Sequence, residues 1–422
     1  MRDETKCLHA GYTPKNGEPR VLPIVQSTTY VYDSAAEVAA IFDDPTKGLC
    51  YSRFGNPTVM AVEEKIAALE GGVGAMCTTS GQAATLLSIL NICEAGDSII
   101  SVPQIYGGTI NLFSFTLKKL GIECIYVDAA SSDEEIKAAF KPNTKLVFGE
   151  TLANPALVVF DIERFANIAH EMNVPLIIDN TFATPILCKP FEFGADIVTH
   201  STTKYMDGHG AGVGGCIVDS GKFDWTKYPD KFPGLCEPDD SYHGITYAEK
   251  FGLAGAYITK ATAQLMRDFG SIQSPQNAFL LNLGLESLHV RIKRHAENGL
   301  AVAKFLQGHD KVAWVKYCGL EGDDDYELAQ KYLPDGSCGV VSFGVKGGRA
   351  AAEDFMQKLK VAAIETHVAD ARTCCLHPAS ATHRQMNDEE LAAAGVSPDL
   401  VRYSCGLEDA EDLIADLKQA LE

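Results

Sequence analysis

Short apolar runs alternate with amphipathic stretches from residue 59 onwards. Val62, Ile66 and Leu69 recur at helical spacing, so we predict a helix here that ends at Gly71-Gly72. The apolar runs that follow have the length of strands and cover residues 73–77, 98–102, 122–127, 145–148, 175–179 and 196–199. Runs such as 176–178 are apolar without alternation, which is typical of strands covered on both faces. The pattern predicts an α/β protein with a mostly parallel central sheet.

The two ends of the chain follow other patterns. Residues 1–58 are rich in Gly, Pro and polar residues without clear periodicity, which predicts an extended arm that needs a partner. A long helical stretch near residues 277–306 leads into further strand and helix patterns, which predict a smaller C-terminal α/β domain. We therefore expect an arm over 1–58, a ligand-binding domain over 59–284 and a C-terminal domain over 285–422. The aromatic segment 222–247 resembles an insertion near a site or an interface.

Composition narrows the classes of partner. The 422-residue chain carries 36 Lys and Arg against 56 Asp and Glu, a net charge of −20, which disfavours nucleic acid and anionic lipid. It has no run of about 18 apolar residues, so we expect no membrane span. The N-terminus lacks an apolar leader segment, which predicts a cytoplasmic protein. The 13 cysteines show no metal-ligand spacing, so we expect reduced thiols and no metal site.

Polar residues end several of the predicted strands, and ligands of open α/β sheets bind at those ends. Ser80-Gly81-Gln82 opens a helix whose N–H groups could hold a phosphate, although an ordinary Ser cap explains it equally well. Asp179 ends a buried strand, where its charge needs a cation such as a pyridinium nitrogen. Helix capping is an equal alternative for this carboxylate. Tyr106 could stack on a flat cofactor, and only the coincidence with the other strand ends favours that interpretation.

Lys204 follows an apolar strand and the hydroxyls of Ser201, Thr202 and Thr203. A lysine that forms a Schiff base must be desolvated enough to lose its proton, and nearby hydroxyls can donate to a phosphate. A lone lysine is usually solvated surface. Glycine-rich sequence after Lys204 and the apolar strand before it weaken that interpretation. We therefore predict a pyridoxal-phosphate (PLP) site built around Lys204.

The same residues resemble the Cys/Met-metabolism PLP family, which has the aspartate-aminotransferase-like fold, PLP fold type I. The matching motifs are Tyr51-Ser-Arg53, Ser80-Gly81, Tyr106-Gly-Gly, Ala153-Asn154-Pro155, Asp179-Asn180-Thr181 and Ser201-Thr-Thr-Lys204-Tyr. Within this family the chain is most similar to the branch that acts on O-acetylhomoserine. The segments that carry this similarity are Pro23-Ile24, Thr28-Thr29-Tyr30, Glu237 to Gly244 and His377 to Gln385.

The resemblance implies roles for individual residues. Lys204 would form the Schiff base and move protons, Asp179 would face the pyridinium nitrogen, and Tyr106 would stack on the ring. The other cofactor-binding residues would be Asn154, Gly81, Gln82, Ser201, Thr203, and, from a neighbouring subunit, Tyr51 and Arg53. Arg402 would bind the substrate carboxylate through its planar fork. These roles imply a homo-oligomer, either a dimer or a tetramer.

The expected reaction is γ-replacement, in which O-acetyl-L-homoserine and sulfide or a thiol give homocysteine or methionine and acetate. Two departures from the family pattern affect this expectation. Gly108 stands where methionine γ-lyases typically carry cysteine, which disfavours that alternative, and His367 stands near the substrate where many relatives have Ser or Asn. A cystathionine γ-synthase-like activity and a non-catalytic PLP-binding protein are further alternatives. An NAD-dependent enzyme is disfavoured because no G-x-G-x-x-G follows an early strand.

Overall fold

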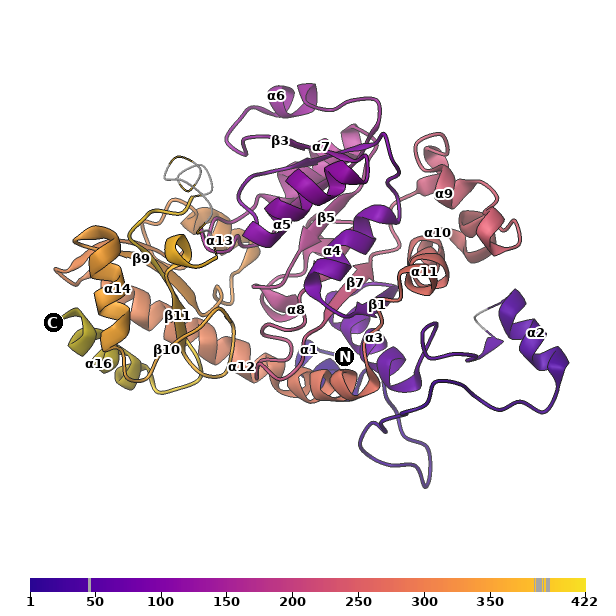
Figure 1. The fold of residues 1–422 in the computed structure, drawn as a ribbon, viewed down its shortest axis with the longest axis horizontal. Coiled ribbons are helices and arrows are strands. Elements are labelled where there is room, and N and C mark those ends of the chain that lie inside the picture. The colour runs from indigo at the N-terminus through magenta and orange to yellow at the C-terminus, as the bar shows by residue number, and fades with distance from the viewer. Residues whose placement is uncertain (45–46, 383, 385–388, 390, 392–394) are drawn as a thin grey trace.

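Two sheets organise the described part of the chain (Figure 1). The computed structural model describes residues 1–44, 47–382, 384, 389, 391 and 395–422. His383 and Gln385 of the segment 377–385 lie outside these residues. The larger sheet is built from strands between residues 74 and 219, and the smaller one from strands between residues 312 and 404. This arrangement confirms the predicted α/β class.

The larger sheet has the order β1-β7-β6-β5-β4-β2-β3 among the described residues. Its strands are β1 Gly74–Thr78, β2 Ser98–Ser101, β3 Glu123–Tyr126, β4 Thr144–Glu150, β5 Leu176–Asp179, β6 Ile197–His200 and β7 Gly215–Asp219. Neighbours from β3 to β6 run parallel, whereas β7 runs antiparallel to both β6 and β1. The six predicted strands are confirmed, and the pattern missed β7.

Helices cover both faces of this sheet because its strands are apolar on both sides. Helix α3 begins after Asn56, whose side chain accepts from the Thr58 N–H, and ends at Gly71 with a φ of 82°. Helix α7 packs on β4 and β5, and α4 packs on β6 and β7. The helices of this region are α3 Pro57–Glu70, α4 Gly81–Leu90, α5 Gly107–Asn111, α6 Asp133–Ala138, α7 Ile162–Glu171, α8 Thr184–Leu187, α9 Pro233–Cys236, α10 Tyr247–Lys260 and α11 Arg267–Phe269.

The smaller sheet has the order β10-β11-β12-β9-β8 within the described ranges. Its strands are β8 Val312–Lys316, β9 Val340–Val345, β10 Ala363–Ile364, β11 Cys374–Leu376 and β12 Leu400–Ser404. Its helices are α12 Pro275–Gln307, α13 Tyr326–Tyr332, α14 Gly348–Lys358 and α16 Ala410–Leu421. Helix α12 contacts both α3 and the smaller sheet. The predicted domain boundary at residue 285 falls inside α12, and this division stays a prediction.

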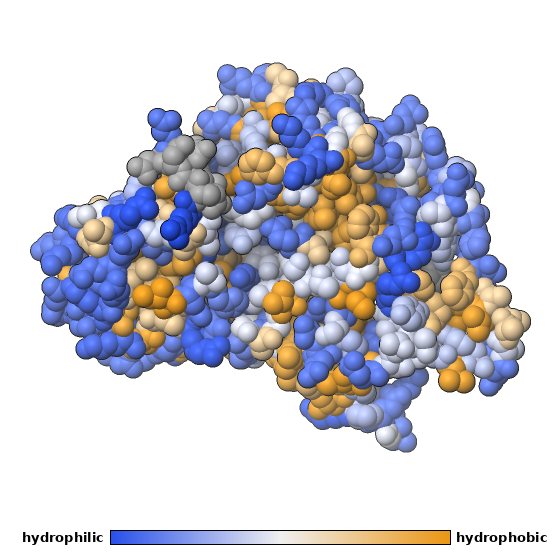
Figure 2. All heavy atoms as spheres, viewed as in Figure 1, coloured by the Kyte–Doolittle hydropathy of each residue, from blue (hydrophilic) through white to orange (hydrophobic). Residues whose placement is uncertain are grey.

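The N-terminal segment contains two short helices, α1 Asp3–His9 and α2 Ala35–Asp43, where the sequence predicted only an extended arm. Helix α1 packs on α12 and α3. Helix α2 lies at the edge of the molecule (Figure 1), where the backbone oxygens of Phe42 and Asp43 accept from Tyr242 Oη at 3.3 Å and Lys250 Nζ at 3.1 Å. Figure 2 shows apolar residues gathered at that edge. In the N-terminal segment Val31 is 99% exposed, and Val21, Ile24 and Phe42 are exposed as well. Among the described residues, every helix is too short or too polar to cross a bilayer.

Candidate active site

Three parallel strands of the larger sheet end at one edge. The register pairs Glu150 of β4 with Asp179 of β5, and Asp179 with Thr199 of β6. A cavity of about 230 Å³ lies at this edge. Its lining residues come from the part of the chain that forms the larger sheet and from the part that forms the smaller sheet. Its lining includes nine residues singled out from the sequence, namely Gly81, Gln82, Tyr106, Asn154, Asp179, Ser201, Thr203, Lys204 and Arg402. The structure therefore brings most of the predicted site together.

Lys204 lies in the turns that follow β6, and it lines the cavity. Burial lowers the pKa of its ammonium group to about 8, and the positive charge of Arg402 acts in the same direction. The Nζ atom lies 3.4 Å from Nδ1 of His367. More of this amine is therefore uncharged near neutral pH than in a solvent-exposed lysine, and the uncharged form is the one needed for attack on a carbonyl or for taking up a proton.

Two carboxyl groups lie side by side at the strand ends. Burial raises the pKa of Asp179, although hydrogen bonds from Thr181 and the nearby His200 oppose this shift. Burial also raises the pKa of Glu150 well above its ordinary value, and the charge of Asp179 adds to this effect. Glu150 Oε1 accepts a 2.6 Å hydrogen bond from the Tyr106 N–H. A cationic group bound beside Asp179 would relieve the cost of its buried charge.

The first turn of α4 lies against the segment that precedes Lys204. The Ser80 hydroxyl caps this helix by accepting from the Ala83 N–H at 3.1 Å. A Cβ added to Gly81 would lie 2.6 Å from Cβ of Ser201, so only glycine allows this close approach. The buried Oε1 of Gln82 has no hydrogen-bond partner in the described part of the chain. Helix N–H groups and hydroxyls at this place form a cradle suited to a phosphate.

Arg402 adds a cationic group to the lining of the cavity. Arg402 lies on β12, is 5% exposed, and donates from Nη1 to Asn154 Oδ1 at 3.3 Å. Its Nη2 donates to the backbone oxygens of Thr366 at 3.2 Å and His367 at 3.0 Å. The buried Nε has no partner among the residues described here. An unused donor on a buried guanidinium is suited to a carboxylate ligand.

Tyr51 and Arg53 do not reach this cavity within the chain. Arg53 donates to the backbone oxygen of Arg267 and lies over the rings of Phe54 and Tyr51. Tyr51 is 39% exposed on the N-terminal segment. Their predicted contact with the cofactor of a neighbouring subunit stays a prediction.

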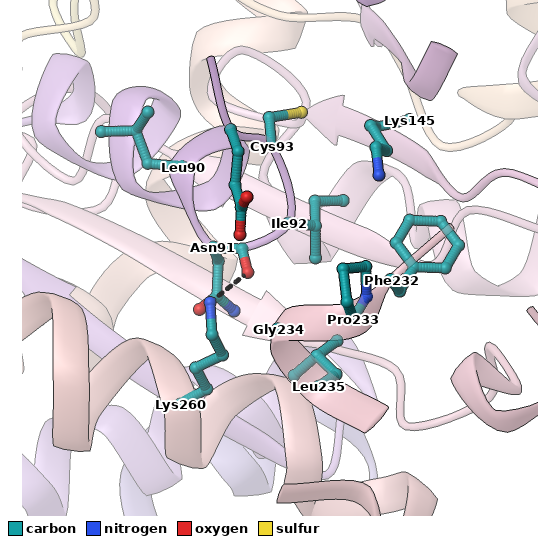
Figure 3. Close-up of a pocket in the computed structure, with 11 residues that line it drawn as sticks. Leu90, Asn91, Ile92, Cys93, Lys145, Phe232, Pro233, Gly234, Leu235 and Lys260 are labelled. Atoms are coloured by element: carbon teal, nitrogen blue, oxygen red, sulfur yellow. Dashed lines mark hydrogen bonds between the residues drawn. The ribbon is translucent and has the colours of Figure 1, made fainter. Parts of the chain in front are cut away.

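A second buried lysine provides a contrast. Burial lowers the pKa of Lys260 to about 8 as well. Its Nζ, however, donates to the backbone oxygen of Asn91 at 2.6 Å, as the dashed line in Figure 3 shows. The cavity beside it measures about 30 Å³, room for roughly one water molecule. The aromatic segment 222–247 lines this small cavity through residues 232–235. A lowered lysine pKa alone thus does not identify the cofactor site, because Lys204 and Lys260 share it. The size of the adjacent cavity distinguishes Lys204 from Lys260.

Three residues of the site or its support had no assigned role in the sequence analysis. Glu150 was missed because the apolar run was taken to end at Phe148, although the strand continues two residues further. Thr181 anchors Ser201 by accepting from its N–H at 2.8 Å. Arg291 of α12 donates to the backbone oxygens of Tyr205 at 2.8 Å and Met206 at 3.3 Å. Arg291 carried no local signal, because its partners lie far away in the sequence.

The cavity fits pyridoxal phosphate at three places: the cradle beside Gly81, the carboxylate of Asp179, and the free amine of Lys204. The family described as Cys/Met metabolism PLP-dependent enzyme matches residues 4–422.

Similar proteins are found at full length. An O-acetyl-L-homoserine sulfhydrylase of Thermus thermophilus is 45% identical, with 100% of both chains covered. A homocysteine synthase of Schizosaccharomyces pombe is 44% identical over 99% of this chain and 98% of its own. A crystal structure of a Campylobacter jejuni protein assigned as an O-acetylhomoserine (thiol)-lyase has a TM-score of 0.96 at 35% identity, with 100% of both chains covered. That structure contains N'-pyridoxyl-lysine-5'-monophosphate. The chain belongs to the Cys/Met metabolism PLP-dependent enzyme family.

Proposed function

We propose that this protein is a PLP-dependent O-acetylhomoserine sulfhydrylase, which converts O-acetyl-L-homoserine and sulfide to L-homocysteine and acetate. The observation that carries the proposal is the joint placement of Lys204, Asp179 and Arg402 around one cavity. The substrate comes from the names of full-length relatives at 44–45% identity. A thiol in place of sulfide would give a thioether such as methionine by the same bond changes.

Pyridoxal phosphate, when bound, supplies an electron sink for the carbanion formed beside the substrate's amino group. Asp179 would hold the positive charge of the ring nitrogen through its carboxylate, while Gly81, Gln82, Ser201 and Thr203 would hold the phosphate. Asn154 would hold the phenolic oxygen, and Tyr106 would support the ring. The presence of these residues in the cavity lining and the family resemblance support these assignments.

Lys204 carries out the proton transfers in this proposal. Its Nζ, with a pKa near 8, takes a proton from the substrate's α-carbon and returns it after replacement. Arg402 holds the substrate carboxylate with its unused Nε donor and thereby orients the α-carbon toward Lys204. The Cγ–O bond of the ester breaks with its electron pair on acetate, and sulfur forms the new bond at Cγ.

Gly108 stands where methionine γ-lyases typically carry cysteine, and this family difference supports replacement over γ-elimination from methionine. A Cβ at this position would lie 2.5 Å from Cε1 of Tyr106 and 2.6 Å from Nε2 of Gln82. A cysteine side chain here would therefore displace the Tyr106 ring or Gln82 from its present place.

A product assay tests the proposal. Purified protein loaded with PLP is incubated with O-acetylhomoserine plus sulfide, and separately with methionine, while homocysteine and 2-oxobutyrate are quantified. We expect homocysteine in the first reaction and at least tenfold less 2-oxobutyrate in the second. Rapid 2-oxobutyrate formation from methionine without homocysteine synthesis would instead identify a γ-lyase. Parallel reactions with succinyl and phospho esters and with methanethiol define the acyl group and the sulfur donor.

We also propose that a second copy of the chain completes the site. Exposed Val31 and the placement of Tyr51 and Arg53 away from the chain's own cavity support an arm that reaches a neighbour. Sedimentation of the protein should show a dimer or tetramer, and a monomer that retains full activity would contradict this part. The cytoplasmic location stays a prediction from the sequence.

A further inference from the structure

His367 lies opposite Lys204 on the segment between β10 and β11. Its Nδ1 is 3.4 Å from Lys204 Nζ. The backbone around it is held firmly, because its carbonyl oxygen accepts from Arg402 Nη2 at 3.0 Å and from Cys374 Sγ at 3.4 Å. The His367 backbone is therefore held in place by Arg402 of β12 and Cys374 of β11. This anchoring positions the imidazole against Lys204 Nζ.

The far side of the imidazole points to a second ionisable group. His367 Nε2 is buried and has no hydrogen-bond partner within the described ranges, and Asp370 Oδ2 lies 4.0 Å from it. Arg372 orients that carboxylate by donating from Nε to Oδ1 and from Nη2 to Oδ2, each at 3.0 Å. The Arg372 side chain is 74% exposed. Lys204, His367, Asp370 and Arg372 thus follow one another from the buried amine to an exposed guanidinium, with 4.0 Å between the imidazole and the carboxylate.

Gly210 leaves room for the side chains of Asp370 and His367. A Cβ at Gly210 would lie 2.7 Å from Asp370 Oδ2 and 3.7 Å from His367 Cδ2, and the φ of this glycine is +63°. A larger residue would therefore both strain the backbone and push the carboxylate from its place.

The charges around His367 favour a neutral ring. Burial lowers the pKa of His367, and the positive charge of Lys204 lowers it further, while nearby carboxylates oppose the shift. The charged and titratable groups that face it are Lys204, Asp207, Glu365, Asp370, Cys374 and Arg402. In a neutral ring, Nδ1 can accept from the Lys204 ammonium while Nε2 carries the hydrogen toward Asp370.

We propose that His367 is a catalytic acid–base residue that exchanges protons with Lys204 Nζ, and that Asp370 is a positioning residue that holds the imidazole in the required tautomer. The role in turnover rests on the proposed sulfhydrylase function. When hydrogen sulfide enters in its neutral form with two hydrogens, sulfur bonds to Cγ and keeps one hydrogen, while acetate leaves with the electron pair of the Cγ–O bond. One proton per turnover must therefore leave the site. Lys204 passes it to Nδ1, and the proton on Nε2 moves toward Asp370 and solvent.

The first test uses the cofactor-free protein and needs no activity. Histidine side-chain NMR spectra are recorded against pH, and His367→Asn identifies the resonance of His367. We expect its pKa below the ordinary histidine value, a rise in Lys204→Met because a positive neighbour is lost, and a fall in Asp370→Asn. A His367 resonance that does not respond to Lys204→Met would overturn the proposal, whatever the enzyme's substrate.

The second test measures turnover in the loaded enzyme. His367→Asn should lower kcat by about 100-fold, a typical contribution of a general acid–base group, with KM changed less than threefold. It should also slow the entry of solvent deuterium at the α-carbon of homocysteine. The control His309→Asn changes a half-buried histidine just beyond the end of α12, whose Nδ1 accepts from the Lys311 N–H, and it should leave both rates within twofold. Unchanged deuterium exchange in His367→Asn would contradict the proton path. Absence of homocysteine synthesis in the unmodified protein would instead refute the proposed function alone.

Discussion

Gly81→Ala places a methyl group where the first turn of α4 meets the segment before Lys204. The added Cβ would lie 2.6 Å from Cβ and 2.9 Å from Cα of Ser201. Non-bonded carbon atoms normally stay about 3.5–4.0 Å apart, so the two backbones must separate by roughly 1 Å. Both segments contribute to the proposed phosphate cradle, and the variant should therefore weaken cofactor binding more than it weakens the fold.

The magnitude follows from the hydrogen bonds at risk. Loss of one hydrogen bond to a charged phosphate costs about 1.5–3 kcal/mol, which corresponds to about 10- to 100-fold weaker binding. The assay is a titration of the cofactor-free protein with PLP, followed by visible absorbance. Gly308→Ala is the matched control, because the nearest atom to its added Cβ is Phe305 O at 3.8 Å. That control should bind PLP within twofold of the unmodified protein. Binding of equal strength in Gly81→Ala would refute the placement of the phosphate.

Two further variants test the support of the site and the electrostatics of the sheet. Arg291→Met removes the guanidinium that donates to the backbone oxygens of Tyr205 and Met206, and should cost on the order of 3 kcal/mol in urea unfolding. Arg294→Met, half exposed on the same helix, should cost less than about 0.5 kcal/mol, and equal losses would contradict the anchoring role. Burial raises the pKa of Asp219 from 3.8 to about 7, so the unmodified protein loses stability as pH rises through this window. Asp219→Asn lacks this loss, so its unfolding free energy relative to the unmodified protein should increase from pH 4 to pH 8. A pH-independent difference would show that Asp219 titrates normally.

The local pattern was sufficient for β1 to β6 and for several of the residues that follow them, although it missed Glu150 at the end of β4. Apolar runs of four to six residues marked β2 to β6 because buried parallel strands need apolar side chains on both faces. Asp179 and Lys204 followed from the rule that ligands bind at the carboxyl ends of such strands. Strand β7, Gly215–Asp219, was missed because it follows a glycine-rich segment without a clear boundary.

The local sequence pattern could not identify residues whose partners lie far away along the chain. Arg402 and Asn154 are separated by 248 positions and meet only after both sheets have formed. Arg402 was therefore identified through the family resemblance rather than from periodicity. The contact between His367 and Lys204 spans 163 positions and had no local signal. Arg291 reaches across 86 positions to the backbone oxygen of Tyr205, so a lone arginine in a long helix gave no sign of its role.

The covalent attachment of the cofactor is the central claim, and borohydride mapping tests it most directly. The protein is loaded with PLP, reduced with borohydride, digested, and analysed by mass spectrometry for pyridoxyl-modified lysine. We predict one modified peptide that contains Lys204 and its loss in Lys204→Ala, with Lys260 unmodified because its amine is held by Asn91 in a small cavity. Modification of Lys260 in place of Lys204, or no modified peptide in active protein, would contradict the account.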